Sequence, residues 1–145
     1  MKLIFFFCAM VCLSCQPQKT IQNNEISFED VQHTAFALHS QRFLVVDTQE
    51  KMDAIFQIIH QHNPGDRFPP IPTINNEETY LVINPEPKNT DDVVVKKIIN
   101  NDGNLIIDIE DFSNPNTSDQ NEKTVSILIK LLKKVNVKNV TITHQ

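Results

Sequence analysis

A β-hairpin in the second half of the chain constrains the fold most. Residues 93–99 are mostly apolar and β-branched, and residues 105–109 return with the same character after the Asn-Asn-Asp-Gly segment at 100–103. Gly103 can adopt the positive φ that a tight hairpin turn requires, and asparagine and aspartate tolerate it nearby. Alternate residues from Leu105 onward share one apolar face, with Asp108 and Glu110 on the other. The sequence therefore predicts an antiparallel pair with one face in a core.

A strand followed by a helix is the clearest unit before the hairpin. Residues 43–46, Phe-Leu-Val-Val, form a continuous apolar run that is typical of a strand covered on both faces. Asp47 is predicted to cap the helix, with Glu50 completing a capping box. An apolar stripe with i, i+3, i+4, i+7 spacing follows, made of Met52, Ile55, Phe56 and Ile59. We expect this stripe to pack on a sheet; a partner-binding face is the alternative.

Three further segments complete the predicted fold. Residues 80–83 are predicted as a strand that two following prolines end, and residues 140–143 as the last strand. Residues 124–135 alternate as in a strand, yet their polar residues also fit one side of a helix, and β-branched side chains favour the strand. The predicted fold class is α+β: a mainly antiparallel β-sheet with one amphipathic helix packed on it, forming a single domain over residues 28–145.

The first fourteen residues are predicted to be a cleaved signal peptide rather than part of the fold. Lys2 supplies a positive start, and residues 3–13 are an apolar run too short to span a bilayer as a mature helix. Residues 11–15, Val-Cys-Leu-Ser-Cys, resemble the lipobox of bacterial lipoproteins, with a small residue before the cysteine that receives the lipid. An ordinary cleaved signal with an incidental cysteine is the alternative. The other two cysteines leave with the peptide, so Cys15 is the predicted lipidation site.

Residues 15–27 are predicted to be a flexible tether, because they are polar and lack hydrophobic periodicity. The residues after Cys15, Gln-Pro-Gln-Lys, lack the acidic run by which some bacteria mark surface-exported lipoproteins. Several acyl chains would anchor the protein firmly to a membrane. We therefore expect a membrane-anchored lipoprotein of the cell envelope that faces the periplasm.

Charge and glycine content exclude several classes of function. Loss of Lys2 with the signal peptide moves the formal net charge from −5 to −6, and an acidic exported domain is a poor nucleic-acid binder. The chain has two glycines, Gly65 and Gly103, which excludes glycine-rich phosphate cradles. We expect no nucleic-acid partner and no cofactor.

Candidate catalytic and metal-ligating residues are few. His60, His62 and Asp66 resemble a ligand cluster, but histidines two apart on a helix point in different directions, so we expect them to stabilise the helix end instead. Glu110 and Asp111 are expected to form a solvated edge rather than a catalytic pair or a calcium site. The sequence has no nucleophile-elbow glycines and no HExxH motif. We therefore predict no catalytic residue and no metal ligand.

The order of elements from about Phe28 to Thr143 resembles the PrcB-type lipoproteins, whose domain is named after an accessory subunit of a bacterial protease complex. The resemblance rests on the 43–47 segment leading into the helix, the Pro-Pro-Ile connection at 69–71, the hairpin around 101–103 and the closing strand at 126–130. The family's glycine-glycine-aromatic segment after the middle strand is replaced by residues 89–93, Asn-Thr-Asp-Asp-Val. The resemblance implies no catalytic residue.

Three hypotheses of different classes follow. The favoured one is a lipid-anchored, non-catalytic periplasmic module that binds another envelope protein and modulates a protease. The second is an immunity or inhibitor lipoprotein, acidic so as to neutralise a basic toxin or a hydrolase. The third is an envelope enzyme, which would need a pocket that gathers His33, His39 or the carboxylates at 108–111.

Overall fold

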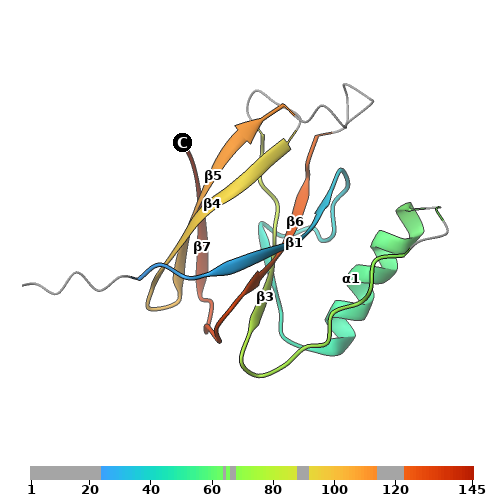
Figure 1. The fold of residues 1–145 in the computed structure, drawn as a ribbon, viewed down its shortest axis with the longest axis horizontal. Coiled ribbons are helices and arrows are strands. Elements are labelled where there is room, and N and C mark those ends of the chain that lie inside the picture. The colour runs from blue at the N-terminus through green and yellow to red at the C-terminus, as the bar shows by residue number, and fades with distance from the viewer. Residues whose placement is uncertain (1–23, 64, 66–67, 88–91, 114–122) are drawn as a thin grey trace, which may run out of the picture.

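The computed structural model describes residues 24–63, 65, 68–87, 92–113 and 123–145 (Figure 1). The predicted signal peptide, Cys15 and the tether up to residue 23 lie outside the described residues. One helix and seven strands follow in the order β1 (Phe28–Thr34), β2 (Phe43–Val46), α1 (Gln49–His62), β3 (Thr79–Ile83), β4 (Asp92–Asn101), β5 (Asn104–Phe112), β6 (Ser126–Leu131) and β7 (Asn139–His144).

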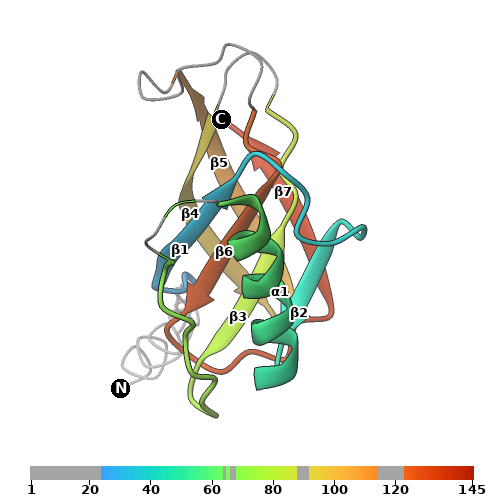
Figure 2. The ribbon, with the colours of Figure 1, turned by 90° about the vertical axis from the view of Figure 1, so that its right-hand side faces the viewer.

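The strands form two sheets that pack face to face. The first sheet has the order β1-β6-β3-β2 with every pair antiparallel, and the second has the order β4-β5-β7. Helix α1 lies on the outer face of the first sheet (Figure 2). The described part of the chain is thus a three-layer α/β/β arrangement, with the four-stranded sheet in the middle.

The middle position of the first sheet explains its continuously apolar strands. All five residues of β3 are buried: Tyr80 and Val82 pack towards α1, while Leu81 and Ile83 belong to the core between the sheets. β6 follows the same alternation, with Leu128 towards the helix and its neighbours towards the second sheet. A strand covered on both faces is therefore mostly apolar along its length. Within the predicted segment 124–135, residues 126–131 form a strand, so the strand prediction is confirmed and the helix alternative is wrong.

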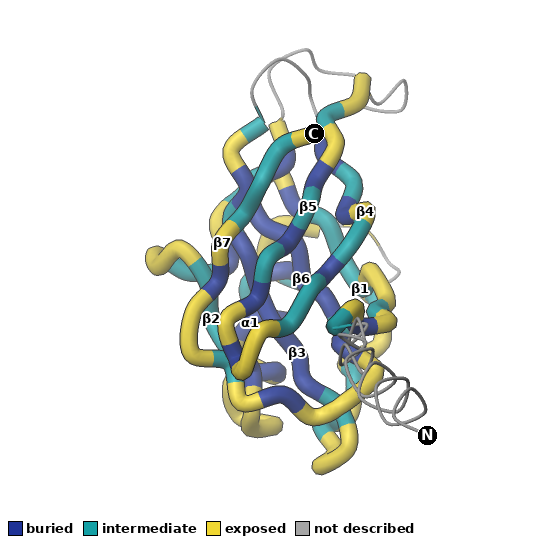
Figure 3. Tube along the Cα trace, turned by 90° about the vertical axis from the view of Figure 1, so that its left-hand side faces the viewer, coloured by how far each residue is buried: buried dark blue, intermediate teal, exposed yellow. Residues whose placement is uncertain are grey.

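The predicted hairpin is confirmed in detail. β4 and β5 pair antiparallel around a turn at Asp102 and Gly103, whose φ values are 53° and 89°. Leu105, Ile107 and Ile109 are buried against the first sheet. The side view of the second sheet shows the alternation of buried and partly exposed positions along β5 (Figure 3).

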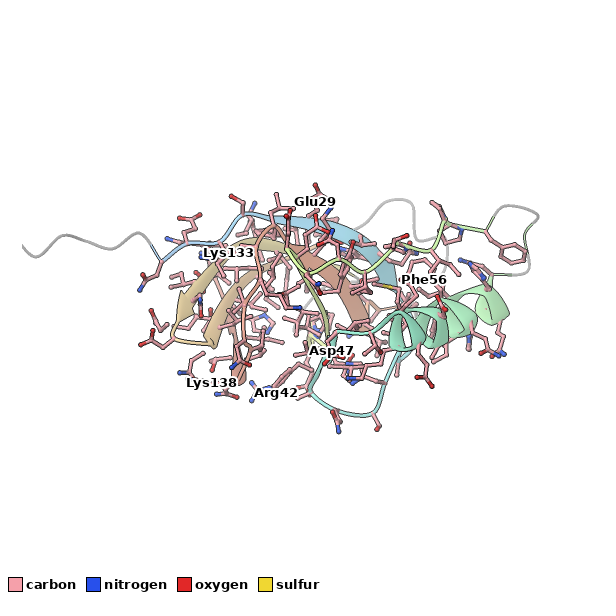
Figure 4. The ribbon with its side chains drawn as sticks, turned by 90° about the horizontal axis from the view of Figure 1, so that it is seen from below. Glu29, Arg42, Asp47, Phe56, Lys133 and Lys138 are labelled. Atoms are coloured by element: carbon pink, nitrogen blue, oxygen red, sulfur yellow. The ribbon has the colours of Figure 1, made fainter. Side chains whose placement is uncertain are left out.

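Helix α1 buries its predicted stripe but starts later than predicted. The side chains of Met52, Ile55, Phe56 and Ile59 are 0–3% exposed, and Phe56 lies between the helix and the strands (Figure 4). The N-cap is Thr48, whose hydroxyl accepts a hydrogen bond from the Lys51 N–H at 3.3 Å. The prediction of Asp47 as the cap with Glu50 in a capping box is thus wrong.

Asp47 has another role, in an ion pair with Lys51. The Lys51 Nζ lies 2.7 Å from the Asp47 Oδ1. Aspartate and threonine are both good caps, so a local pattern in which they are neighbours does not decide between them.

Residues 24–27, which the sequence assigned to the tether, already pack against the second sheet. Ile26 is 2% exposed, and its N–H donates to the Ile98 carbonyl at 2.8 Å. Glu25 forms an isolated antiparallel bridge with Ile99. These contacts cover part of the outer edge of β4.

The α+β class, with one helix and mostly antiparallel strands, is confirmed. The structure differs from the prediction in having two sheets rather than one, and in the parallel pairing of β7 with β5. Parallel neighbouring strands require a crossover connection. Here the chain leaves the second sheet after β5, forms β6 in the first sheet and then returns to the second sheet as β7.

Candidate functional site

One side of the two-sheet assembly is open, because both sheets end there in an edge strand. β2 is the last strand of the first sheet and β7 the last strand of the second, and two views place them on the same side (Figures 2 and 3). Two hollows open on this side. Both are lined by residues next to or within β2 and by residues next to or within β7. We call this region the β2–β7 cleft.

The first hollow of the cleft is polar. It has a volume of about 490 Å³ and is lined by Ser40, Gln41, Arg42, Asn84, Glu86, Ile142 and His144. Arg42 and Glu86 are exposed at its rim, while Asn84 is held rigidly in its wall. The Asn84 amide nitrogen donates to the carbonyls of His39 and Gln41 at 3.2 Å and 2.7 Å.

A buried hydroxyl fixes the loop that carries Arg42. Ser126 is 0% exposed; its hydroxyl accepts from the Leu38 N–H at 3.0 Å and donates to the Asn84 Oδ1 at 2.6 Å. Unsatisfied polar groups are costly to bury, so these bonds hold the loop against the sheet. The first hollow is therefore a preformed shape.

His144 lines the first hollow and is paired with Asp111. The His144 Nδ1 lies 3.0 Å from the Asp111 Oδ1, and the two side chains are 18% and 16% exposed. Each comes from a different strand of the second sheet, Asp111 from β5 and His144 from β7. The His144 ring and the Asp111 carboxylate at the end of the sheet can hydrogen-bond the polar groups of a bound chain.

The second hollow is smaller and more apolar. It has a volume of about 400 Å³ and is lined by Val45, Val46, Asp47, Thr79, Lys134, Val135, Asn136 and Val137. The Val135 N–H donates to the Thr79 hydroxyl at 2.8 Å, which anchors the connection between β6 and β7 to the first sheet. Val45, Val137 and Ile142 are partly buried side chains that line the cleft and pack on the core between the sheets.

The backbone of β2 offers hydrogen-bonding groups to the cleft side. The Asn84 N–H donates to the Arg42 carbonyl at 3.2 Å, and Phe43 to Val46 continue the same antiparallel register. Bonded and non-bonded residues alternate along such a pair. The N–H groups of Phe43 and Val45 therefore point away from β3, towards the open edge.

A second polar cluster lies at another place, around His33. Its Nδ1 lies 3.0 Å from the Asp92 Oδ1, and its Nε2 contacts the Asp30 carboxylate. The Thr124 hydroxyl also bonds Asp92. His33 is on β1 and Asp92 on β4, so the cluster joins the two sheets.

The two carboxylates favour the charged form of the His33 ring. Burial by itself would lower the pKa of His33, but the hydrogen bonds and charges of Asp30 and Asp92 outweigh it and raise the pKa. A general base needs a ring nitrogen with a free lone pair, and both nitrogens here face a carboxylate. A hollow of about 560 Å³ lies beside His33. Because both ring nitrogens contact carboxylates, His33 is better suited to linking the two sheets than to acid–base catalysis.

The carboxylates at 108–111 do not converge on one point. Asp108 accepts from the Thr143 hydroxyl, Glu110 pairs with the Lys96 Nζ at 2.8 Å, and Asp111 pairs with His144. The expectation of a solvated edge fits Glu110, whose side chain is 50% exposed, but it is wrong for Asp111, which is mostly buried on the central strand of its sheet. None of the hollows described above combines His33, His39 and these carboxylates.

The remaining candidate histidines have separate partners. His39 accepts from the Gln41 N–H at 3.1 Å, and burial lowers its pKa. His60 contacts the Pro69 carbonyl at 3.3 Å and packs on Phe68, whereas His62 stacks on Phe36. Asp66 and the predicted lipidation site Cys15 lie outside the described residues.

Sequence reasoning missed the residues that the structure pairs across strands. Asp30, Asp92, Thr124 and His144 come from distant parts of the chain, and no local motif marks them. The only available signal was the presence of isolated charged residues in otherwise apolar strands, which often find a partner when buried.

Among the described residues, no group of three or more histidine, cysteine, aspartate or glutamate side chains could hold a metal ion. Within the same residues, no helix is long and apolar enough to cross a bilayer. Comparison with known proteins gives no match: no family model, no curated protein and no solved structure is similar to the chain. The resemblance to PrcB-type lipoproteins stays a prediction.

Proposed function

We propose that the protein is a lipid-anchored, non-catalytic accessory module of the cell envelope that binds another envelope protein in the β2–β7 cleft. Cys15 carries the lipid, and the domain faces the periplasm. The observation that supports binding most directly is the open side of the two-sheet assembly, where two edge strands flank a cleft with both polar and apolar lining.

The form of the cleft favours an extended segment of a partner protein. An exposed strand edge binds such a segment by adding it as a further strand, with backbone hydrogen bonds giving affinity and side-chain pockets giving specificity. β2 supplies outward backbone groups at Phe43 and Val45, and the second hollow supplies an apolar pocket beside Val45. β2 has four residues, so the added pairing is short and the partner needs both hollows.

The first hollow adds chemical selectivity. Arg42 and Glu86 present opposite charges at its rim, and His144 and Asn84 present hydrogen-bonding groups in its wall. Such a surface complements the backbone and mixed polar side chains of a peptide. The internal pairing of the His33 and His144 rings with carboxylates supports a binding role over a nucleophile with its base.

A protease is the class of partner that the PrcB resemblance suggests. A module that occupies a substrate-like segment of such an enzyme, or of its regulator, would modulate proteolysis without chemistry of its own. The lipid anchor would confine this effect to the membrane surface.

Site-specific photocrosslinking in intact cells tests the proposal. A photoreactive residue placed at Glu86 or Ser40, at the rim of the first hollow, should give a discrete crosslinked product. The same residue at Gln57, on the exposed side of α1, is the matched control. Equal products at the cleft and control positions, or none at the cleft, would refute the binding site.

Two variants separate strand addition from simple contact. Val45→Pro removes an N–H that points to the open edge, and proline is tolerated on edge strands. Val45→Ala removes most of the side chain and keeps the N–H. Val45→Pro should abolish the crosslink and Val45→Ala should weaken it, with thermal melts showing that both variants are folded.

Cys15→Ala should abolish lipidation, as measured by mass spectrometry of the mature N-terminus. A Cys15 without lipid in the wild type would refute the anchor.

A further inference from the structure

We propose that the connection between β6 and β7, residues 132–138, is a surface that lies against an anionic lipid bilayer and sets the orientation of the anchored domain. The inference rests on the proposed function, because it requires attachment to a membrane through Cys15. We call residues 132–138 the lysine loop. Residues 134–137 also line the second hollow of the β2–β7 cleft, so the loop faces lipid through its exposed residues Leu132, Lys133 and Lys138, which line neither hollow.

The side chains of the lysine loop suit the surface of a membrane. Leu132 is 44% exposed, one of four large hydrophobic residues exposed among the described residues. Lys133, Lys134 and Lys138 are exposed, and the loop contains no acidic residue. An apolar side chain flanked by lysines is the pattern by which peripheral segments bind anionic lipid interfaces.

The lysines of the loop are not used inside the domain. Within the described residues none of the three forms an ion pair, whereas Lys96, Lys97 and Lys130 are each paired with a glutamate. The pKa of Lys130 is raised by its two glutamate partners, Glu29 and Glu78. The paired lysines are neutralised by the protein itself, so the lysine loop carries positive charge that is open to an external partner.

The lysine loop is next to the point where the chain enters the domain. The Leu132 N–H donates to the Ser27 carbonyl at 2.9 Å, three residues after the start of the described chain at Asn24. Eight residues lie between Cys15 and Asn24 in the sequence, so the nine Cα–Cα steps span at most about 32 Å. A lipid on Cys15 would therefore hold the lysine loop within reach of the bilayer. Viewed from below, Lys133 and Lys138 lie on the half of the molecule where the described part of the chain begins (Figure 4).

Acidic residues at this end limit the strength of the attraction. Glu25 is 3.6 Å from Lys97, Asp102 lies in the neighbouring turn, and the pKa of Asp47 is lowered mainly by Lys51 and slightly by Lys134. The rest of the domain is acidic overall and would be repelled by an anionic surface. The lysine loop thus orients a domain that the lipid already holds, rather than binding membranes by itself.

Depth-dependent fluorescence quenching of the lipidated full-length mature protein tests the inference. The protein is reconstituted in phosphatidylcholine vesicles with about one-third phosphatidylglycerol, an anionic lipid. Asn136→Cys places a free thiol for an environment-sensitive dye in the lysine loop, and Ser113→Cys places it after β5 as a control. A nitroxide on the lipid headgroup should quench the dye at 136 more strongly than the dye at 113.

Charge variants separate orientation from anchoring. Lys133→Glu with Lys138→Glu should remove at least half of the extra quenching at position 136, as should high salt or vesicles of phosphatidylcholine alone. Lys96→Glu with Lys123→Glu makes the same change in net charge elsewhere and should leave the quenching unchanged.

Vesicle flotation distinguishes failure of the inference from failure of the proposed function. If the protein floats but quenching is equal at 136 and 113, or insensitive to the lysine-loop variant, the orientation is refuted and the anchor stands. If the wild type does not float, both the anchor and the orientation are refuted.

Discussion

Replacing Gly103 with alanine is expected to lower the free energy of unfolding by about 2–5 kcal/mol. Gly103 has a φ of +89°, and a positive φ costs a non-glycine residue about 1–2 kcal/mol. A Cβ at this position would lie 2.3 Å from the Asn136 carbonyl oxygen, and the backbone shift needed to relieve such overpacking costs about 1–3 kcal/mol. The shift would also strain the hydrogen bond from the Lys138 N–H to the Gly103 carbonyl, which is 2.8 Å long.

The other glycine of the chain is a matched control. A Cβ at Gly65 would have no atom within 4 Å, so Gly65→Ala should change stability by less than about 1 kcal/mol, in the stabilising direction. Gly103→Asn separates the two costs, because asparagine tolerates positive φ but still brings a Cβ to Asn136. It should therefore fall between the two alanine variants.

Urea unfolding of the mature lipidated protein in detergent micelles, followed by far-UV circular dichroism, measures these differences as shifts in midpoint at constant slope. If Gly103→Ala unfolds within about 0.5 kcal/mol of Gly65→Ala, the close approach of the hairpin turn to the β6–β7 connection is refuted.

Three further predictions concern polar groups. Because the pKa of His33 is raised above 6.5, its charged ring should stabilise the fold fully below pH 6.5, and this contribution should be lost as the pH rises through the raised pKa. Urea unfolding across this pH range should show the loss of stability. The same pH profile in His33→Gln as in the wild type would contradict the prediction. Thr48→Ala should cost about 1 kcal/mol and Asp47→Ala less than about 0.5 kcal/mol in the same assay, with equal losses arguing against Thr48 as the cap. Ser126→Ala should cost about 1–3 kcal/mol, since it leaves the buried Leu38 N–H and the partly buried Asn84 Oδ1 without this partner. The exposed Ser113→Ala should have no measurable effect, and similar values for the two variants would refute the network around Ser126.

Local patterns were sufficient for the elements whose signals are strong. Gly103 beside Asp102 predicted the hairpin because few residues adopt the φ values of that turn. The spacing of Met52, Ile55 and Phe56 predicted the buried face of α1, because helical periodicity alone brings these side chains together.

Long-range features could not be predicted in the same way. The apolar strands at 43–46 and 80–83 indicated burial on both faces, but not that a second sheet covers one of them. The parallel pairing of β7 with β5 depends on β6 crossing between the sheets, and no short segment encodes that crossing. The choice of Thr48 rather than Asp47 as the N-cap of α1 could not be predicted either, since threonine and aspartate are both favourable N-cap residues.

The candidate site shows most clearly which features depend on local sequence and which depend on tertiary structure. The sequence by itself determined the acidic charge, the helix stripe and the hairpin, and it predicts the lipidation site at Cys15, because the two elements and this signal depend on residues that are close together in the chain. Only the tertiary structure decided the β2–β7 cleft, the His33 cluster and the proximity of the lysine loop to Ser27. Each of these joins residues from strands far apart in sequence, and their contacts arise from sheet order and register, which are set by packing of the whole core rather than by local preference.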